Sequence, residues 1–360
     1  MIFLYVILAI LILLIMITIH EFGHYLSAKL LRFDISEFSI GFGPKIFKRK
    51  SKKTDEVFSI GVLPLGGYCA FYDEKGDASD ENTIPANKKP FNSEKPWKRL
   101  IVLLSGPLLN LFSAFFFSFI YILAVGYAVP TVVEIYDNPF TGESYVSALE
   151  TGDEIIAIND VDINVMNSFS ELTANNKLGE SLKFTILRDG EEQDVYIAKQ
   201  NVSIKTESGE YVSKELFGFT SSNTVKSVSF EYAFGMSFPY TFKLSGMIIG
   251  SFGQLITGQI PLTELSGPIG TVTTMATYAE LDWRYILLFL PLIASNLAIF
   301  NLFPIPSLDG ARAIFTIIEW LRGKPINRKI EGYIHTVGLL MLLAFVLIID
   351  VVGIFMRYLQ

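Results

Sequence analysis

Residues 20–24 read His-Glu-Phe-Gly-His within a segment that carries no other charge from residue 1 to residue 28. Histidines at positions i and i+4 lie on one face of a helix, and this spacing lets two imidazole nitrogens bind one zinc ion. The glutamate between them can act as a general base toward a water molecule at the metal. The pattern therefore predicts a hydrolytic zinc site with His20 and His24 as ligands and Glu21 as the base. Two incidental histidines and a buried glutamate are the weaker alternative, because ionisable residues inside an apolar span are costly and usually functional.

A catalytic zinc site needs a third protein ligand and leaves its fourth position for water. The chain contains three histidines and one cysteine. His335, near the start of another apolar run, is interpreted as incidental, and Cys69 as filler rather than a nucleophile. The third ligand is then expected to be an acidic residue within an apolar run. Asp309, in the sequence NLFPIPSLDG of residues 301–310, is the candidate, whereas Asp350 is expected to lie too far across the bilayer.

The elements that carry these residues are long apolar runs. The 360 residues are 51% hydrophobic and 18% charged with a formal net charge of −7, and the mean hydropathy is +0.42. A helix needs about 20 apolar residues to cross a bilayer, and runs of this kind occupy residues 1–19 (continuing through the histidines), 100–129, 285–320 and 333–356. This excludes a single soluble globule, and the acidic balance argues against a nucleic-acid partner.

The first run is expected to be a retained span. A signal peptide is the alternative, but the run lacks a basic start and a small-residue cleavage site. Basic residues gather in the segments 29–99 and 322–329, so both are expected to be cytoplasmic. These features predict a multi-span α-helical membrane protein with four transmembrane helices and extracytoplasmic N and C termini.

The stretch 230–256 is apolar but holds Glu231, Pro239, Lys243 and four glycines. We expect helices that lie along the membrane surface here. A fifth span is the alternative, and it would invert the third run and move Asp309 to the opposite side of the bilayer from the histidines.

Residues 130–205 contain short β-rich runs, such as 181–187 and 194–198, with a turn signal at Arg188-Asp189-Gly190 between them. Residues 146–163 resemble a PDZ domain, through Gly152, Asp153, Ile155, Ile158 and Asn159. PDZ domains bind chain ends or add a strand at a sheet edge, so a peptide or chain end is the expected partner. A generic β-domain is the alternative.

The expected domains are 1–129, with the first two spans; 130–205, the extracytoplasmic PDZ-like domain; 206–283, a linker with interfacial amphipathic helices; and 284–360, with the last two spans. Within the first, residues 57–71 read VFSIGVLPLGGYCAF, which is uncharged, β-prone and interrupted by a turn signal. We expect a membrane-associated β-hairpin at about 57–72 on the cytoplasmic side, with residues 64–67 as its turn or edge.

Several residues are candidate substrate contacts. A helical substrate hides its scissile carbonyls and must be stretched, and the free edge of the hairpin could hold it as an added strand. The candidates there are Leu65, Gly66 and Gly67. Asn301 and Asn110 are amides expected at membrane depth, for which a plain interhelical hydrogen bond is the alternative. Non-helical backbone at this depth must line a cavity or be covered by protein, and the third run is expected to open at Pro304, Pro306 and Gly310.

The ordered set of motifs resembles the site-2 protease family of intramembrane zinc metalloproteases, in its bacterial type with a PDZ insert. HEFGH matches the H-E-x-x-H of this family, and residues 301–310 match N-x-x-P-x-x-x-x-D-G. GVLPLGGY (61–68), SGPLLN (105–110) and LSGPIG (265–270) match further elements. Ala311 departs from the usual second glycine after the aspartate, and only one PDZ-like segment is visible where some relatives have two.

The resemblance implies a multi-pass protein of the bacterial cell (inner) membrane in which His20, His24 and Asp309 hold Zn²⁺ and Glu21 is the base. It also implies substrates that are single-span membrane proteins, already trimmed on the outer side and then cut within or beside the remaining span. Anti-sigma factors and signal-peptide remnants are examples of such substrates in regulated intramembrane proteolysis. A membrane zinc transporter and a catalytically idle PDZ scaffold are the alternatives.

Overall fold

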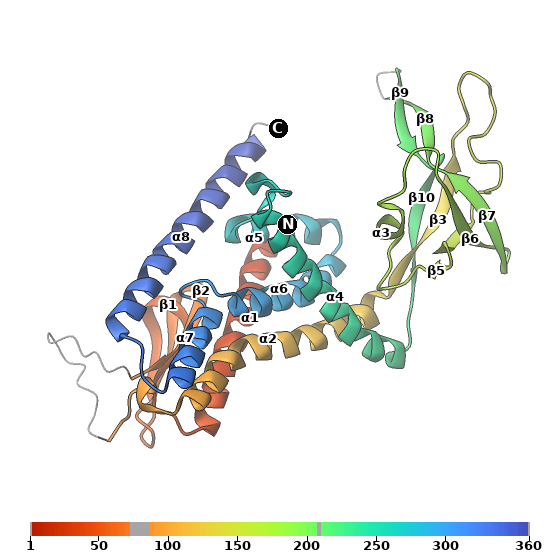
Figure 1. Ribbon diagram of the computed structural model, residues 1–360. Coiled ribbons are helices and arrows are strands. Elements are labelled where there is room, and N and C mark those ends of the chain that lie inside the picture. Colours follow the sequence, from red (N-terminus) through yellow and green to blue (C-terminus); the bar gives the residue numbers. More distant parts are fainter. Residues whose placement is uncertain (1, 73–86, 207–209, 359–360) are drawn as a thin grey trace. The chain divides into compact units, whose positions relative to one another are not determined.

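The computed structural model describes residues 2–72, 87–206 and 210–358 (Figure 1). It contains two compact units, the first formed by Met1–Ser118 with Thr241–Gln360 and the second by Phe119–Tyr240. Among the described residues, four helices are long and apolar enough to cross a membrane. They are α1 (Ile2–Leu30), α2 (Pro96–Val125), α6 (Arg284–Leu302) and α8 (Arg328–Tyr358). The prediction of four spans is confirmed at this level, and the side on which the termini lie remains a prediction.

One face of α1 is buried and carries the two histidines. The buried positions include Ala9, Ile12, Met16, His20 and His24, which recur at the three- and four-residue spacing of one helical face. The apolar part of this face packs in one core cluster with residues of α2, α5 (Pro268–Leu281) and α6. The histidines are thereby turned toward the interior of the first unit rather than toward lipid.

The third apolar run is interrupted before Asp309. Helix α6 ends at Leu302, and α7 (Asp309–Arg322) begins with the aspartate itself. The predicted span to about residue 320 is therefore too long, since α7 is a separate helix of 14 residues. Gly310 lies inside α7 and does not open the chain, contrary to the prediction. A β-carbon at Gly310 would lie 2.3 Å from the Leu302 carbonyl oxygen, so the start of α7 packs against the end of α6.

The stretch 230–256 forms one helix, α4 (Phe230–Ile256), which is not among the four candidate spans. A short η2 (Leu262–Glu264) leads from it to α5. Asp350 of α8 accepts hydrogen bonds from the main-chain N–H groups of Ile269 and Gly270, at 3.4 and 3.1 Å. This carboxylate caps the beginning of α5, which has no side-chain cap of its own.

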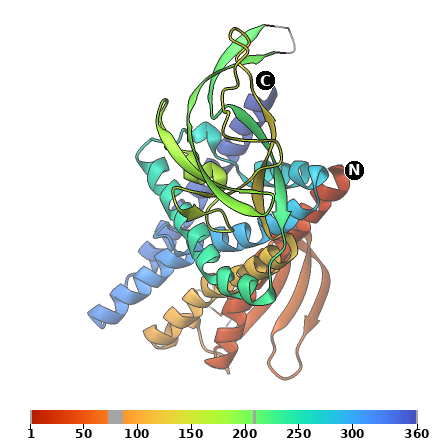
Figure 2. The same cartoon turned by 90° about the vertical axis from the view of Figure 1, so that its right-hand side faces the viewer.

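Strands β1 (Ile35–Lys50) and β2 (Val57–Phe71) form a separate sheet in the first unit. Phe38 of β1 is paired with both Phe58 and Cys69 of β2, because the two long strands bend back on each other. Residues 57–71 were predicted to form a hairpin by themselves, but they form one strand that pairs with β1. The turn between the two strands lies at 51–56. Residues 67–71 pair only with β1 in the described part of the chain, so they form a free edge. Strand β2 contacts α1, and Figure 2 shows the sheet beside this helix.

The second unit is built on a six-stranded sheet in the order β10-β3-β4-β6-β7, with β5 paired to β4. The strands are β3 (Tyr127–Ile135), β4 (Glu154–Ile158), β5 (Val161–Asp162), β6 (Ser181–Arg188), β7 (Glu191–Ala198) and β10 (Phe219–Lys226). Strands β8 (Gln200–Lys205) and β9 (Tyr211–Leu216) form a separate pair, and α3 (Phe169–Thr173) is the one short helix between β5 and β6. The sheet thus extends to residue 226, beyond the predicted limit of 205.

The β6–β7 hairpin follows the turn signal in the sequence. Arg188 is paired with Glu191, and the two residues between them, Asp189 and Gly190, have φ of 51° and 86°. Positive φ at both central positions matches the twist of a two-residue hairpin. The sheet buries a cluster that includes Ile155, Phe184 and Ile186, and Gly152 and Asp153 directly precede β4. The PDZ character of this unit remains a prediction.

Candidate metal centre

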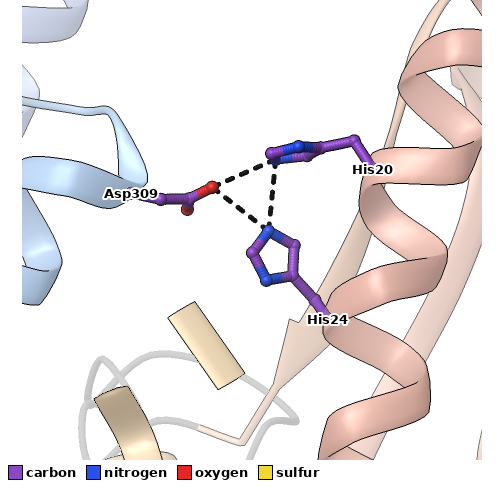
Figure 3. Close-up of side chains that lie close together, drawn as sticks. All are labelled: His20, His24 and Asp309. Carbon is purple, nitrogen blue, oxygen red and sulfur yellow. Dashed lines mark hydrogen bonds and ion pairs between the residues drawn. The ribbon is translucent and has the colours of Figure 1, made fainter. Parts of the chain in front are cut away.

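His20, His24 and Asp309 meet at one point of the first unit (Figure 3). The two Nε2 atoms lie 3.2 Å apart. Asp309 Oδ2 lies 3.0 Å from Nε2 of His20 and 3.2 Å from Nε2 of His24. The histidines come from neighbouring turns of α1, and the aspartate is the first residue of α7. Both histidines are buried, with 7% and 8% of their surface exposed.

This donor set fits a zinc ion. Two imidazole nitrogens and one carboxylate oxygen are a ligand set of catalytic zinc sites, which leave a fourth position open. With bonds of about 2.0–2.1 Å, neighbouring ligand atoms of a tetrahedral zinc site lie about 3.3 Å apart. The three donor atoms here are 3.0 to 3.2 Å apart, so little movement separates them from that arrangement.

The rings of the two histidines are oriented by α2. Nδ1 of His24 lies 2.8 Å from the carbonyl oxygen of Val102, so Nδ1 donates and the lone pair of Nε2 is free for a metal. Nδ1 of His20 lies 3.4 Å from Nδ2 of Asn110. Asn110 is completely buried, and its Oδ1 has no hydrogen-bond partner among the described residues. The structure thus places Asn110 against His20, and its role as a substrate contact remains a prediction.

Glu21 is held by the free edge of β2. Its Oε2 accepts a hydrogen bond from the main-chain N–H of Cys69, at 3.0 Å. Gly67 lies next to the same side chain, because a β-carbon at this position would be 3.7 Å from Glu21 Cγ. Burial, together with the nearby carboxylates of Glu21 and Glu56, raises the pKa of the Cys69 thiol. A thiol that stays protonated is a poor nucleophile, which agrees with the interpretation of Cys69 as filler.

The remaining predicted contacts lie in two places. Asn301 is in the last turn of α6 and donates to the carbonyl oxygen of Leu297 in the same helix, at 2.9 Å. No hydrogen bond links it to the histidines or the aspartate within the described residues. Gly66 has φ of 147°, and a β-carbon there would lie 2.3 Å from the ring of Phe42, so it serves the bend of β2. The main chain of Leu65 belongs to β2, but its side chain is outside the described part of the structure.

His335 makes a hydrogen bond that the sequence did not indicate. Its Nδ1 accepts a hydrogen bond from the main-chain N–H of Ser307, at 2.9 Å. Ser307 has φ of 86°, a conformation that costs a non-glycine residue about 1–3 kcal/mol. Ser307 lies two residues before Asp309, so His335 contacts the segment that presents the third predicted ligand. The cost of a lone histidine in an apolar helix was the signal in the sequence that could have revealed this.

A buried ion pair connects the helices near the end of α7. Nη2 of Arg99 in α2 lies 2.5 Å from Glu319 in α7, and only 2% of the arginine side chain is exposed. Glu319 also pairs with Arg328 of α8, at 2.8 Å. The pair therefore links the helix that orients the histidines with the helix that begins at Asp309.

Known proteins of similar sequence cover nearly the whole chain. A protein of Fusobacterium nucleatum, whose assigned name is that of a zinc metalloprotease, is 29% identical over 337 residues, which are 93% of this chain and 94% of that protein. Zinc metalloprotease RasP of Geobacillus kaustophilus is 28% identical over 412 residues, covering 92% and 93% of the two chains. The regulator of sigma E protease of Haemophilus influenzae is 25% identical over 421 residues, covering 92% and 94%.

The family model described as "Peptidase family M50" matches residues 8–345. The match confirms the resemblance drawn from the motifs, the zinc cofactor and the bacterial inner membrane as the location. It also favours an enzyme over a zinc transporter or an idle scaffold. The chain belongs to peptidase family M50, the site-2 protease family of zinc-dependent membrane metalloproteases.

Proposed function

We propose that the protein hydrolyses peptide bonds within or beside the membrane-spanning segment of single-span proteins that have already been shortened on their outer side. The observation that carries the proposal is the position of the metal centre. His20 and His24 lie on the buried face of α1, a candidate membrane span, and Glu21 contacts a free strand edge. A metal centre within a membrane span would lie at the depth at which a membrane-spanning substrate has its peptide bonds.

In this proposal Nε2 of His20, Nε2 of His24 and Oδ2 of Asp309 hold the zinc ion. When bound, zinc polarises the peptide carbonyl and increases the acidity of a water molecule at the site. Asn110 would orient His20 through Nδ1, and Val102 does the same for His24. The zinc-binding form of His20 would carry its proton on Nδ1 and would need an acceptor there. A turn of the Asn110 amide that exchanges Nδ2 for Oδ1, which is unpartnered among the described residues, would supply that acceptor.

Glu21 would accept a proton from the attacking water and later give it to the leaving amine. The Cys69 N–H binds Oε2 and so fixes the direction of the carboxylate relative to the strand. A base that is held in place before the substrate arrives needs less reorganisation during the reaction.

The free edge of residues 67–71 would bind the substrate as an added strand. An unpaired edge presents N–H and C=O groups that can pair with an extended peptide. Pairing keeps the peptide unwound, as hydrolysis of a helical segment requires. Gly66, Gly67 and the main chain of Leu65 lie at the start of this edge, and Asn301 is proposed as a contact from the interrupted third helix.

The second unit would select substrates. Its edge strands, β7 and β10, can bind a chain end or an extended peptide in the manner of a PDZ domain. We place this unit and both termini on the outer side of the membrane, and we place α4 along the membrane surface, which follows from the charge distribution of the sequence.

The test uses the full chain purified in detergent and a labelled single-span substrate, in one form trimmed on its outer side and in another with the outer domain intact. We expect a zinc chelator to abolish cleavage, and the trimmed form to be cut faster than the intact one. Glu21→Gln should lose cleavage but keep stoichiometric zinc, whereas Glu231→Gln, in α4, should behave as the parent. Appreciable cleavage by Glu21→Gln would contradict the assignment of the base.

A further inference from the structure

A tight turn directly precedes Asp309. The N–H of Leu308 donates to the carbonyl oxygen of Ile305, at 3.1 Å. Pro306 occupies the second position of this turn, and Ser307 the third, with φ of 86°. Proline followed by a residue with positive φ is the pattern of a type II turn, whose third position favours glycine or asparagine. A serine keeps this conformation only where its surroundings impose it.

Helix α8 supplies the surroundings that impose it. His335 accepts the Ser307 N–H at 2.9 Å. Gly338 lies three residues further, on the same face of the helix, and a β-carbon there would lie 2.3 Å from Cβ of Pro306. Two consecutive residues of the turn, Pro306 and Ser307, thus contact α8 independently of each other.

The imidazole of His335 acts through one nitrogen. Nδ1 accepts the hydrogen bond, so the neutral ring carries its proton on Nε2, and Nε2 has no hydrogen-bond partner in the part of the chain that the structure describes. The ring also packs against Phe315 of α7, with centroids 5.5 Å apart. His335 therefore touches both the turn and the helix that follows it.

We propose that His335 is a positioning residue of the metal centre: by accepting the Ser307 N–H, it holds the turn that presents Asp309 to His20 and His24. The inference depends on the proposed role of Asp309 as a zinc ligand. The start of α7 has no side-chain cap of its own, so the turn is the direct main-chain support of the aspartate. Relaxation of the turn would withdraw Oδ2 from the histidine pair, and a metal site tolerates only small displacements of its ligands.

The experiment compares zinc affinity, kcat and KM of the full chain in detergent, with zinc affinity measured by competition with a chelator. His335→Leu removes the acceptor, His335→Asn keeps an acceptor near the position of Nδ1, and Ser307→Gly removes the strain. Val337→Leu, on an exposed position of the same helix, is the matched control, and thermal unfolding checks that each variant is folded.

We expect His335→Leu to weaken zinc binding by about tenfold, the lower range for loss of a group that supports a ligand, and to lower kcat with little change in KM. His335→Asn and Val337→Leu should stay within about twofold of the parent. In the Ser307→Gly background, His335→Leu should lose much less, because glycine adopts the turn without support.

Zinc affinity of His335→Leu equal to that of the parent would overturn the inference. An equal loss with and without Ser307→Gly would overturn it too, since it would show that the histidine acts by packing alone. Asp309→Ala separates this failure from failure of the proposed function. If Asp309→Ala loses zinc while His335→Leu does not, only the positioning role is wrong, whereas full zinc binding by Asp309→Ala removes the ligand assignment and both proposals with it.

Discussion

A β-carbon at position 106 would lie 2.3 Å from Nε2 of His24. The same atom would lie 2.9 Å from Cε1 of His20, so Gly106 of α2 faces both rings. Gly23 of α1 lies against the main chain of α2, because a β-carbon at this position would lie 2.4 Å from the carbonyl oxygen of Ser105. The two helices approach each other through these glycines, and the metal centre is closed on this side by main chain.

Gly106→Ala should therefore damage the metal centre directly. The added methyl group must displace an imidazole, because the backbone on both sides leaves no room, and we expect zinc affinity to fall by more than about tenfold. Overpacking of this kind costs about 1–3 kcal/mol of stability. Gly246→Ala in α4, where nothing lies within 4 Å of the added atom, is the matched control and should leave zinc binding unchanged. Chelator competition and thermal unfolding in detergent measure the two effects.

The ion pair between Arg99 and Glu319 makes a second prediction. Glu319→Gln leaves a guanidinium that is 2% exposed without its anion, and breaking a buried pair from one side costs about 3–5 kcal/mol. Arg99→Met combined with Glu319→Leu should cost less, since no buried charge remains. Glu331→Gln removes the partly exposed pair with Arg328 and should cost less than about 1 kcal/mol. Equal unfolding midpoints for Glu319→Gln and Glu331→Gln would show that the buried pair contributes no more than the exposed one.

The signals in the sequence for the two histidines and the aspartate are local. Helical spacing alone places His20, Glu21 and His24 on neighbouring turns, and the prolines before Asp309 indicate where the third run is interrupted. The structure brings the two histidines and the aspartate together as expected. Their roles as ligands and base are the proposals that the zinc and cleavage measurements address.

Features that depend on packing between distant segments could not be predicted from the sequence. Nothing in the sequence of residues 35–50 indicated that part of this segment, residues 37–40, would form the strand that separates 57–60 from 67–71. Gly106 lies in the matched segment SGPLLN, but its approach to both imidazole rings follows only from the crossing of α1 and α2. The hydrogen bond of His335 joins residues 28 positions apart, and no periodicity connects them.

In the second unit, the pair formed by Asp153 and Arg188 predicts a pH dependence. Burial of the Asp153 carboxyl would raise its pKa, but the hydrogen bonds from Arg188 and the Glu150 N–H outweigh burial and hold the pKa below its usual value. A carboxylate whose pKa is lowered by folding stabilises the fold above its unfolded pKa of about 3.9, and this stability is lost as the pH falls through the folded value.

Asp153→Asn should accordingly destabilise the second unit by about 2 kcal/mol at pH 7, the range of a charged hydrogen bond. The difference from the parent should shrink as the pH is lowered below about 4. Hydrogen exchange of β4 and β6 in the full chain, corrected for the intrinsic rate at each pH, measures both. Asp160→Asn is the control, because Asp160 is 76% exposed in its pair with Lys183 and should have a smaller effect. A difference that is constant from pH 7 to pH 3 would contradict the prediction.

Cys69 contacts Glu21 through its main-chain N–H. Two substitutions at this position therefore test the role of the main chain and the role of the thiol separately. Cys69→Pro removes the N–H that binds Oε2 of Glu21, and the main-chain N–H at this position is not needed for the pairing with β1. A proline is tolerated on a free edge, so the sheet and the zinc ligands should remain. We expect kcat to fall by about 10²-fold or more, as for a misplaced catalytic group, with zinc affinity unchanged.

Cys69→Ala keeps the N–H and should cleave at the parent rate, which also tests the thiol. Loss of activity in both variants would mean that the sulfur matters, whereas full activity of Cys69→Pro would mean that Glu21 needs no support from the strand.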